Sequence, residues 1–404
     1  MISAEHGAEL MKLVLEMKEY PSNINADTKT GGWKVRHPHI GEATPTIRGT
    51  DANGNVTVKC AHDFLSPNAD KTMCVLPQRI DVGRHFIMSG GADGMRESFQ
   101  SSVHRVTSFG RYYMGTNGLD PRLPPLVSTL FADDKFQKAA KNICPKHQQL
   151  LDPFQFNVIM QVPGQTVASH IDAPYFWGAD RLDFPQWLLA AMVFSDLFTN
   201  LFVHQVQVVG YLSDISGKDG ADGEFIYYQT NDEGRYSKET AEYLAGSCVD
   251  GSKLVHASRV YRPKDQVPHL DKDKDSSLVY VGGDKWELRV DGVAIKEYPA
   301  SDLRISIVYR ARCFEDEAEL ADYRAYPESE RMTLDHVLNV LIQGLAKAGV
   351  TTEEAAHAMP KVDLAELLIS HYIKYPLPSV DAQPVMPWNY CLLSKKFPFL
   401  GDIC

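Results

Sequence analysis

The sequence QFNVIMQVPGQTVASHIDAPY occupies residues 155–175 and contains two short runs with the character of β-strands. The first run is apolar and ends at Pro163-Gly164, and the second carries His170 and Asp172 with one residue between them. Because alternate side chains of an extended strand share a face, His170 and Asp172 are expected to point the same way. An imidazole and a carboxylate on one face predict part of a metal site.

A third ligand is expected further along the chain, because these two side chains cannot hold a divalent ion alone. His204 lies in the apolar run LFVHQVQVVGYL, where a core histidine hydrogen-bonded to the backbone is the better interpretation. His256 lies in the glycine-led strand GSKLVHASRVYRP and is the preferred third ligand. Two histidines and one carboxylate with open positions are typical of non-haem Fe(II) oxygenases.

A lone His-x-Asp triplet is a weak signal, because the 14 histidines of this chain produce such triplets by chance. A second one, His269-Leu-Asp271, stands in the run PHLDKDKDSS. Alternating Asp and Lys beside a proline indicate a solvated loop with no strand to fix the two side chains. We therefore expect this second triplet to bind no metal.

The strand LRISIVYRARCF, residues 303–314, carries several arginines among apolar residues. The two-residue period places these side chains on one face: Arg304, Ser306, Val308, Arg310 and Arg312. Arginines buried without anions are costly, so the face predicts an anion-binding site. A solvated sheet edge is the alternative.

Composition bounds the functional classes. The chain has 404 residues and a net charge of -11, which disfavours broad affinity for nucleic acid or anionic membranes. Its seven cysteines are odd in number and scattered, so we expect neither a disulfide framework nor a thiolate zinc site. With no signal peptide or membrane-length apolar run, the sequence predicts a cytoplasmic protein.

The pattern along the chain predicts many short strands and flanking helices. Amphipathic helices are expected at residues 4–18, 126–143, 332–348 and 352–373, the last before an extended tail. Strands are expected from Trp33 to Cys60, around the turn at residues 51–55, and then repeatedly from residue 154 to 314, around a compact apolar segment at 187–198. Such strands favour an antiparallel sandwich or barrel.

Several stretches resemble Fe(II)/2-oxoglutarate-dependent dioxygenases. VPGQTVASHID is similar to their Pro-Gly and His-x-Asp stretch, GEFIYY to the strand that follows, and RISIVYR to their Arg-x-Ser strand, with the two-arginine spacing of the AlkB branch. The resemblance implies a mainly β fold with flanking helices and a double-stranded β-helix (jelly-roll, cupin-like) core. It assigns residues 151–316 to that core, 1–150 to an N-terminal α/β region packing on it, and 317–404 to a C-terminal helical extension and tail.

By this resemblance His170, Asp172 and His256 bind Fe(II) and are the catalytic residues. Arg304 with Ser306 holds the 2-oxoglutarate cosubstrate, and Arg310 assists. Oxidation of a small-molecule or peptide substrate by dioxygen, with release of succinate and carbon dioxide, is the implied reaction.

The residue at position 172 bears on the outcome, since related halogenases have a small residue there. Asp172 therefore indicates hydroxylation or a related oxidation. Tyr175, Phe176 and Trp177 follow the ligands and are candidates for the substrate mouth, with ordinary aromatic core as an equal alternative.

Two features depart from the family pattern. Gln161 stands where a tyrosine often contacts the cosubstrate, and Arg304 lies much farther from His256 than is usual. The longer spacing predicts an inserted loop and hairpin within residues 265–298, with Arg262 as the alternative anchor. The rival functions are an AlkB-like nucleic-acid demethylase, opposed by the acidic charge, and a non-catalytic metal-binding jelly-roll module.

Overall fold

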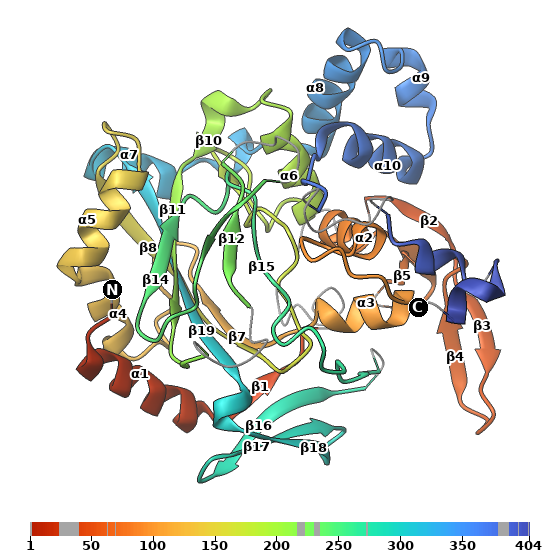
Figure 1. Ribbon diagram of the computed structural model, residues 1–404. Helices are drawn as coiled ribbons and strands as arrows, with labels where there is room; N and C mark the ends of the chain where they lie inside the picture. The colour runs from red at the N-terminus through yellow and green to blue at the C-terminus, as the bar shows by residue number, and fades with distance from the viewer. Residues whose placement is uncertain are drawn as a thin grey trace.

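The computed structural model describes residues 2–23, 40–62, 64–68, 70–215, 223–229, 235–271, 274–378, 388–394, 396–402 and 404. These residues form mainly β-sheet, with helices packed around the sheets (Figure 1). The largest sheet is antiparallel, and its strands follow the order β14 (Gly246–Val249), β11 (Gln205–Tyr211), β19 (Arg304–Phe314), β8 (Leu150–Gln161) and β7 (Phe109–Met114).

The two faces of this sheet differ in chemistry because side chains alternate along each strand. One face is apolar and fully buried, with Phe156 and Val158 of β8 next to Ile307 and Tyr309 of β19. The other face carries polar residues and faces a cavity, whose lining includes the following side chains of β8 and β19: Gln155, Asn157, Ile159, Arg304, Ser306, Val308 and Arg310.

A smaller sheet faces the main one and contains β13 (Ser237–Glu239), β12 (Phe225–Tyr227) and β15 (His256–Ser258) in that order. The extended segment that contains His170 adds to its edge through an antiparallel bridge to His256. The chain passes repeatedly between the two sheets, since β8 and β11 lie in the large sheet while the His170 segment and β12 belong to the small one.

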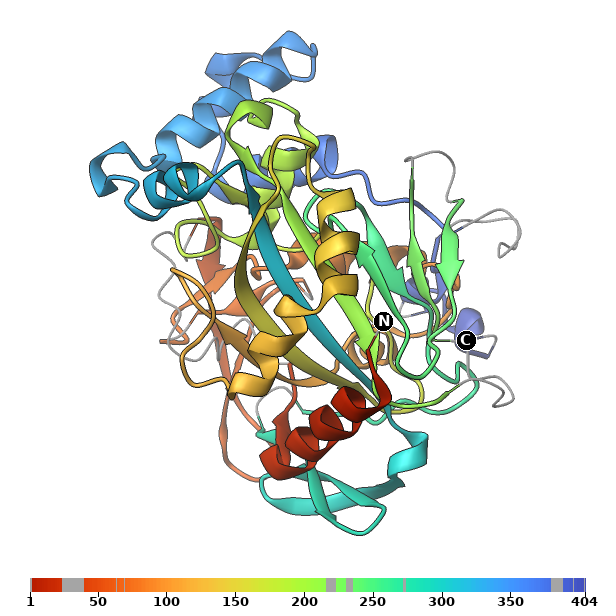
Figure 2. The same cartoon turned by 90° about the vertical axis from the view of Figure 1, so that its left-hand side faces the viewer.

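Three helices cover the apolar face of the main sheet, as Figure 2 shows: α1 (Ala4–Met17), α4 (Pro125–Ala132) and α5 (Asp134–Ile143). The helix predicted at 126–143 is therefore two helices. The break lies at Asp133, whose carboxylate accepts hydrogen bonds from the backbone N–H groups of Lys135 and Phe136 and so caps α5.

A second helical group packs on its own apolar core: α6 (Gln186–Phe194), α8 (Leu334–Lys347), α9 (Glu353–Ala358) and α10 (Lys361–Tyr372). The apolar segment 187–198 thus begins as helix α6, and the helix predicted at 352–373 is interrupted at Met359-Pro360, because proline cannot continue a helix. Helix α7 (Glu317–Arg324) follows β19 directly. The predicted tail is described only in part, since residues 379–387 lie outside the described ranges, and short 3₁₀ turns follow at Tyr390–Leu393 and Pro398–Asp402.

An inserted sheet separates β15 from β19, as the long spacing between His256 and Arg304 predicts. It contains β16 (Ser276–Gly282), β17 (Lys285–Val290) and β18 (Val293–Pro299), and β1 (Glu19–Pro21) pairs with β16 at its edge. Strands β17 and β18 are joined by a tight turn at Asp291-Gly292, both of which have positive φ.

Several shorter elements complete the described part of the chain. Helices α2 (Ile80–Ser89) and α3 (Phe99–Arg105) are followed along the chain by β7. The short strands are β2 (Glu42–Pro45), β3 (Ile47–Thr50), β4 (Val56–Lys59), β5 (Ser66–Pro67), β6 (Met73–Val75), β9 (Tyr175–Phe176) and β10 (Phe202–Val203). The hairpin expected at 51–55 joins β3 and β4, whereas the start of the expected strand region, residues 33–39, lies outside the described ranges.

The expectation that the cysteines form no disulfides is wrong. Six of them are paired in the structure, as Cys60–Cys74, Cys144–Cys313 and Cys391–Cys404, and Cys248 is free. Pairing depends on spatial proximity, and Cys144 at the end of α5 meets Cys313 at the end of β19 only in the folded chain. The cysteines therefore give no support to the expected cytoplasmic location, since disulfides persist mainly in oxidising environments.

No helix of the described ranges combines the length and the apolar character that crossing a bilayer requires.

The disulfides predict a specific labelling pattern. Alkylation of the unfolded protein without reductant should add one group, at Cys248, and prior reduction should allow seven, as measured by mass spectrometry. The native protein should label slowly, because burial raises the pKa of the Cys248 thiol to about 12. Seven groups without reductant would contradict the pairing.

The long-range pair should also contribute to stability. The double variant Cys144→Ala/Cys313→Ala should lose roughly 2–4 kcal/mol of unfolding free energy, because the bridge restricts the unfolded chain. Urea unfolding measures this loss, with Cys248→Ala as the control that removes a thiol but no bridge.

Candidate metal centre

A sharp turn carries the chain from the main sheet into the candidate metal site. Gly164 has a φ of +91°, and its N–H donates to the carbonyl of Tyr261 at 2.7 Å. An added Cβ would lie 3.0 Å from the backbone of Asp265 and Val267. The positive φ and the close backbone approach explain why glycine follows Pro163 at this turn.

Backbone hydrogen bonds place the two candidate histidine ligands next to each other. The N–H of His170 donates to the carbonyl of His256, and the reverse bond is also made, both at 3.0 Å. The N–H of Asp172 donates to the carbonyl of Gly251 at 2.8 Å. In such an antiparallel pair the side chains stand side by side, and the two imidazole centroids are 4.3 Å apart.

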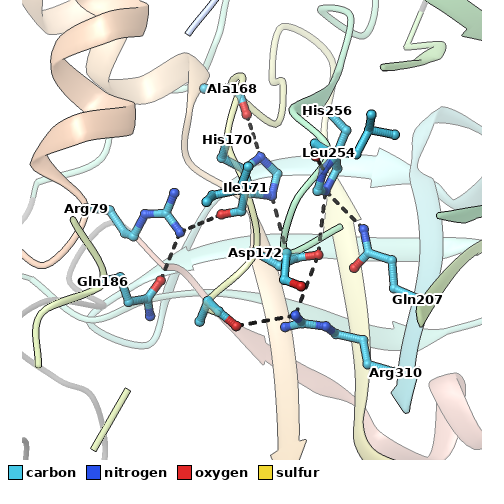
Figure 3. Close-up of polar contacts among 12 residues, drawn as sticks. Arg79, Ala168, His170, Ile171, Asp172, Gln186, Gln207, Leu254, His256 and Arg310 are labelled. Atoms are coloured by element: carbon cyan, nitrogen blue, oxygen red, sulfur yellow. Dashed lines mark hydrogen bonds and ion pairs between the residues drawn. The ribbon is translucent and has the colours of Figure 1, made fainter. Parts of the chain in front are cut away.

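The three side chains converge in space, as shown in Figure 3. Nε2 of His170 lies 3.7 Å from Oδ1 of Asp172, and Nε2 of His256 lies 3.7 Å from Oδ2. One ligand atom from each residue can be chosen so that all lie within 4.8 Å of one another. Ligands at right angles around an ion with bonds of about 2.1 Å stand about 3 Å apart, so a small inward movement suffices.

In both imidazoles a hydrogen bond at Nδ1 fixes the orientation of the ring, so that Nε2 is left to bind a metal. Nδ1 of His170 lies 2.7 Å from the carbonyl of Ala168, and Nδ1 of His256 lies 2.9 Å from that of Leu254. A carbonyl can only accept, so in the neutral rings these bonds put the proton on Nδ1 and leave the Nε2 lone pair facing Asp172.

The charge states suit a metal as well. Burial opposes ionisation of Asp172, but Arg310 and the two histidines hold the pKa of this carboxyl well below its usual range. Burial, aided by His170, lowers the pKa of His256 to about 4, so this ring is neutral at neutral pH. Oδ2 of Asp172 is buried and has no hydrogen-bond partner, as expected for an atom reserved for an ion.

One neighbour contacts the nitrogen that a metal needs. The side-chain amide of Gln207 on β11 lies 3.0 Å from Nε2 of His256. Its Oε1 is buried without a partner. An ion bound to Nε2 of His256 would have to replace this contact with Gln207. The alternation of Gln205 and Gln207 with valines was a usable signal for a polar face on this strand.

The arginines of strand β19 have different surroundings: two line the cavity and one is paired with a buried carboxylate. Arg304, Ser306 and Arg310 line a cavity of about 1040 Å³ together with the candidate ligands. Arg312 lies farther along the strand, outside this cavity lining, and its Nε donates at 2.8 Å to buried Asp152, which is its pairing partner on β8. Of the three arginines expected on this face, Arg304 and Arg310 thus line the cavity and Arg312 does not.

Each of the two cavity arginines is held by glutamines. Arg304 donates to Oε1 of Gln161 and, through Nε, to the carbonyl of Gly223 at 3.1 Å. Arg310 donates to Oε1 of Gln155 at 3.1 Å and lies 3.9 Å from Asp172. The glutamine that departs from the family pattern therefore contacts the arginine directly.

The alternatives considered from the sequence lie elsewhere. His204 is hydrogen-bonded to Asp250 at 3.1 Å rather than to the backbone, and exposed His269 stacks on His104 with centroids 4.8 Å apart. Arg262 is paired with Asp265 and Asp302.

The three aromatic residues that follow the ligands pack in the protein interior. Tyr175 contacts Phe154, Phe176 packs on Phe198 and Phe202, and Trp177 meets Tyr323 and Tyr326. They therefore follow the core interpretation rather than the substrate-mouth one.

Arg79 is a site residue that the sequence did not reveal. It stands at the start of α2, and its Nη1 donates at 3.0 Å both to the carbonyl of Ile171 and to Oε1 of Gln186 (Figure 3). Its Nη2 pairs with Asp81 at 3.3 Å. The guanidinium thus fixes the backbone between the two candidate ligands His170 and Asp172.

The sequence matches no protein-family model and no curated protein. Solved structures similar to this chain include 2OG-Fe(II) oxygenases, the superfamily that its motifs resemble. A prolyl-4-hydroxylase from Pseudomonas putida is 13% identical, with a TM-score of 0.27 and coverage of 51% of this chain and 71% of that one. HygX from Streptomyces hygroscopicus, solved with nickel, 2-oxoglutarate and hygromycin B, is 12% identical, with a TM-score of 0.26 and coverage of 50% and 69%.

A third similar structure is a prolyl hydroxylase from Trichoplax adhaerens, in complex with a peptide of hypoxia inducible factor. It is 14% identical, with a TM-score of 0.25 and coverage of 60% of this chain and 77% of that one. TM-scores at this level do not establish a shared fold. The function proposed below therefore rests on the geometry of the site.

Gly251 offers a test of the metal centre. A Cβ at this position would overlap Oδ2 of Asp172 and lie 2.6 Å from Nε2 of Gln207. Gly251→Ala should therefore weaken Mn(II) binding roughly tenfold or more, as measured by titration with electron paramagnetic resonance. Gly49→Ala in the exposed β3–β4 hairpin, where the added Cβ meets only Oγ1 of Thr57 at 3.3 Å, is the matched control. Unchanged affinity in a folded Gly251→Ala protein would exclude Asp172 as a ligand.

Proposed function

We propose that this protein is an Fe(II)- and 2-oxoglutarate-dependent dioxygenase that hydroxylates or otherwise oxidises a small-molecule or peptide substrate and releases succinate and carbon dioxide. The observation that carries the proposal is that His170, Asp172 and His256 meet in one cavity with Arg304. Two histidines and one carboxylate with room around them are the ligand set of non-haem Fe(II) oxygenases.

The proposed core is a double-stranded β-helix. In chain order, β8, the His170 segment, β11 and β12 alternate between the large and the small sheet, and β14, β15 and β19 continue the alternation after β13. This winding supports a jelly roll at residues 151–316, with residues 1–150 packing on it and 317–404 as an extension. Strand β7 of the N-terminal region widens its large sheet.

The ligand fit is supported by Oδ2 of Asp172, which is buried without a hydrogen-bond partner. His170, Asp172 and His256 would hold the Fe(II) through Nε2, a carboxylate oxygen and Nε2. When bound, iron and 2-oxoglutarate would activate dioxygen, which is the oxidant of the reaction. Arg310 stabilises the ionised form of Asp172, and Arg79 holds the backbone of the ligand segment in place.

Arg304 is the proposed anchor for the distal carboxylate of 2-oxoglutarate. It is 2% exposed and lies in a polar pocket with Gln161 and Tyr211, whose ring centroid is 5.1 Å from its guanidinium carbon. A buried guanidinium binds a carboxylate through charge-assisted, bidentate hydrogen bonds. Apolar cavity residues of neighbouring strands, Val209, Phe225 and Val308, exclude water around it.

The alternative of an AlkB-like demethylase is favoured by one observation, that Arg304 and Arg310 both line the cavity with the spacing of that branch. Binding to oligonucleotides that weakens steeply with salt would support it. The alternative of a silent metal-binding module is excluded if the protein forms succinate.

Activity provides the direct test. With Fe(II), 2-oxoglutarate and oxygen the protein should release succinate even without substrate, and Asp172→Ala should abolish this release while the protein still unfolds cooperatively. Succinate is measured by mass spectrometry. Absence of succinate, together with absence of 2-oxoglutarate binding, would refute the proposal.

The cosubstrate anchor can be tested separately. Arg304→Gln should raise the KM for 2-oxoglutarate roughly tenfold or more, because a charge-assisted pair is lost in a buried site. Arg262→Gln, which removes the alternative anchor and its bonds to Asp265 and Asp302, should leave KM unchanged. The opposite result would move the anchor to Arg262.

A further inference from the structure

A residue of the C-terminal extension reaches the rear of the candidate metal site. Tyr375 lies shortly after helix α10, and its hydroxyl donates at 2.6 Å to Oδ2 of buried Asp81 in the first turn of α2. The same carboxylate oxygen accepts a hydrogen bond from Nη2 of Arg79 at 3.3 Å. Nη2 of Arg79 also lies 3.5 Å from the hydroxyl oxygen of Tyr375, so the three polar groups contact one another.

The other terminal nitrogen of Arg79 contacts the ligand segment. Nη1 donates at 3.0 Å to the carbonyl of Ile171, which stands between His170 and Asp172 (Figure 3). It also donates at 3.0 Å to Oε1 of Gln186, the first residue of α6. Because a guanidinium is rigid and planar, the contacts that hold Nη2 also fix the direction in which Nη1 points.

An apolar cluster joins the same parts of the molecule. Tyr375 belongs to the buried cluster that contains Ile171, and Val255 and Ala257, the two neighbours of His256, belong to it as well. The residue between two candidate ligands and the residues on both sides of the third ligand therefore pack in one cluster with Tyr375. The C-terminal extension thus contacts the rear of the site through apolar packing as well as through Arg79.

The side chain of Tyr375 is itself held in a defined position. Its ring meets the edge of His85 of α2 and of Phe194 of α6, with centroids 5.5 Å and 5.6 Å away. Burial and the neighbouring Asp81 raise the pKa of Tyr375 well above its usual value, so the hydroxyl keeps its proton and donates it to the carboxylate. The packing of the ring therefore determines where this donor stands.

We propose that Tyr375 and Asp81 are positioning residues of the metal centre, which hold Arg79 against the carbonyl of Ile171 and thereby couple the C-terminal extension to metal affinity. The inference rests on the metal centre of the proposed function and adds two residues outside the ligand set. Asp81 also compensates the charge of Arg79, a cation that would otherwise oppose the binding of a second cation nearby. Loss of either group therefore loosens the ligand segment without removing a ligand.

The experiment measures the affinity for Mn(II) by titration with electron paramagnetic resonance, which requires no turnover. Tyr375→Phe removes one hydroxyl and keeps the packed ring, and it should weaken Mn(II) binding roughly threefold or more. Asp81→Asn should weaken binding further, because it leaves the charge of Arg79 uncompensated. Thermal unfolding shows that each variant is folded at the temperature of the titration.

Tyr372→Phe is the matched control. The hydroxyl of Tyr372 in α10 is also buried, and it donates at 2.7 Å to the carbonyl of Leu341 in α8. Its removal should lower the thermal stability much as Tyr375→Phe does, but it should leave the Mn(II) affinity unchanged. Equal weakening of Mn(II) binding by both variants would assign the effect to the stability of the extension and would overturn the inference.

A double variant tests whether Tyr375 acts through Arg79. Arg79→Gln alone should weaken Mn(II) binding roughly tenfold or more, because the backbone between two candidate ligands loses its support. Adding Tyr375→Phe to Arg79→Gln should change the affinity little further, since residues that act through one contact show non-additive effects. If the two effects multiply instead, Tyr375 does not act through Arg79 and the inference fails.

The unaltered protein distinguishes this inference from the proposed function. If it binds no Mn(II), the metal centre is refuted, and the proposed function and this inference fail together. If it binds Mn(II) and both Tyr375→Phe and Asp81→Asn bind the ion equally tightly, this inference alone is overturned. If the variants bind more weakly but the unaltered protein forms no succinate, the positioning role stands and the oxygenase proposal fails.

Discussion

Two backbone hydrogen bonds between His170 and His256 are the contact on which the site depends. They join a segment that follows the first long strand of the core to a strand much farther along the chain, and each is 3.0 Å long. Because these bonds join main chains, they fix the backbone positions of both histidines. The contacts of each Nδ1 with a local carbonyl then fix the orientation of the ring. Asp172 then completes the group through its own backbone bond to Gly251.

Along strand β19, the face and the position of a side chain decide whether it packs in the apolar core, lines the cavity or pairs with another charge. Ile305, Ile307 and Tyr309 pack in the apolar core, whereas Arg304 and Arg310 face the cavity. Arg312 lies beyond the cavity lining and pairs with Asp152 of β8, so its charge is compensated within the protein. Buried arginines are tolerated here because each has acceptors within the protein: Arg304 donates to Gln161 and Gly223, Arg310 to Gln155 and Gln205, and Arg312 to Asp152.

The sequence was most informative where the two-residue period of a strand applies. It predicted that His170 and Asp172 share a face, that Arg304 and Arg310 do so too, and that a hairpin insertion separates His256 from Arg304. It did not reveal the role of Arg79. The side chain of this residue, at the start of a helix, donates to the backbone carbonyl of Ile171, and such a contact produces no periodic pattern in the sequence. The rest of the cavity wall contributed by α2, α3 and β7 was hidden for the same reason.

Helix boundaries and cysteine pairing could not be predicted well for related reasons. Asp133 and Pro360 end helices that the apolar period alone joins into longer ones. Disulfide partners are chosen by the folded chain, and nothing near Cys144 in the sequence indicates Cys313. The assignment of the apolar segment at 187–198 also needed the structure, since a short buried run fits either a helix or a strand.

The bridge between Cys144 and Cys313 closes a covalent ring that contains His170, Asp172, His256 and Arg304. A protease that cuts once within that ring, for example in the loops around β16–β18, would leave both pieces attached to each other. Such a nicked molecule would migrate as an intact chain until a reducing agent released its fragments. A single cleavage would therefore leave all three candidate metal ligands on the same covalently joined molecule.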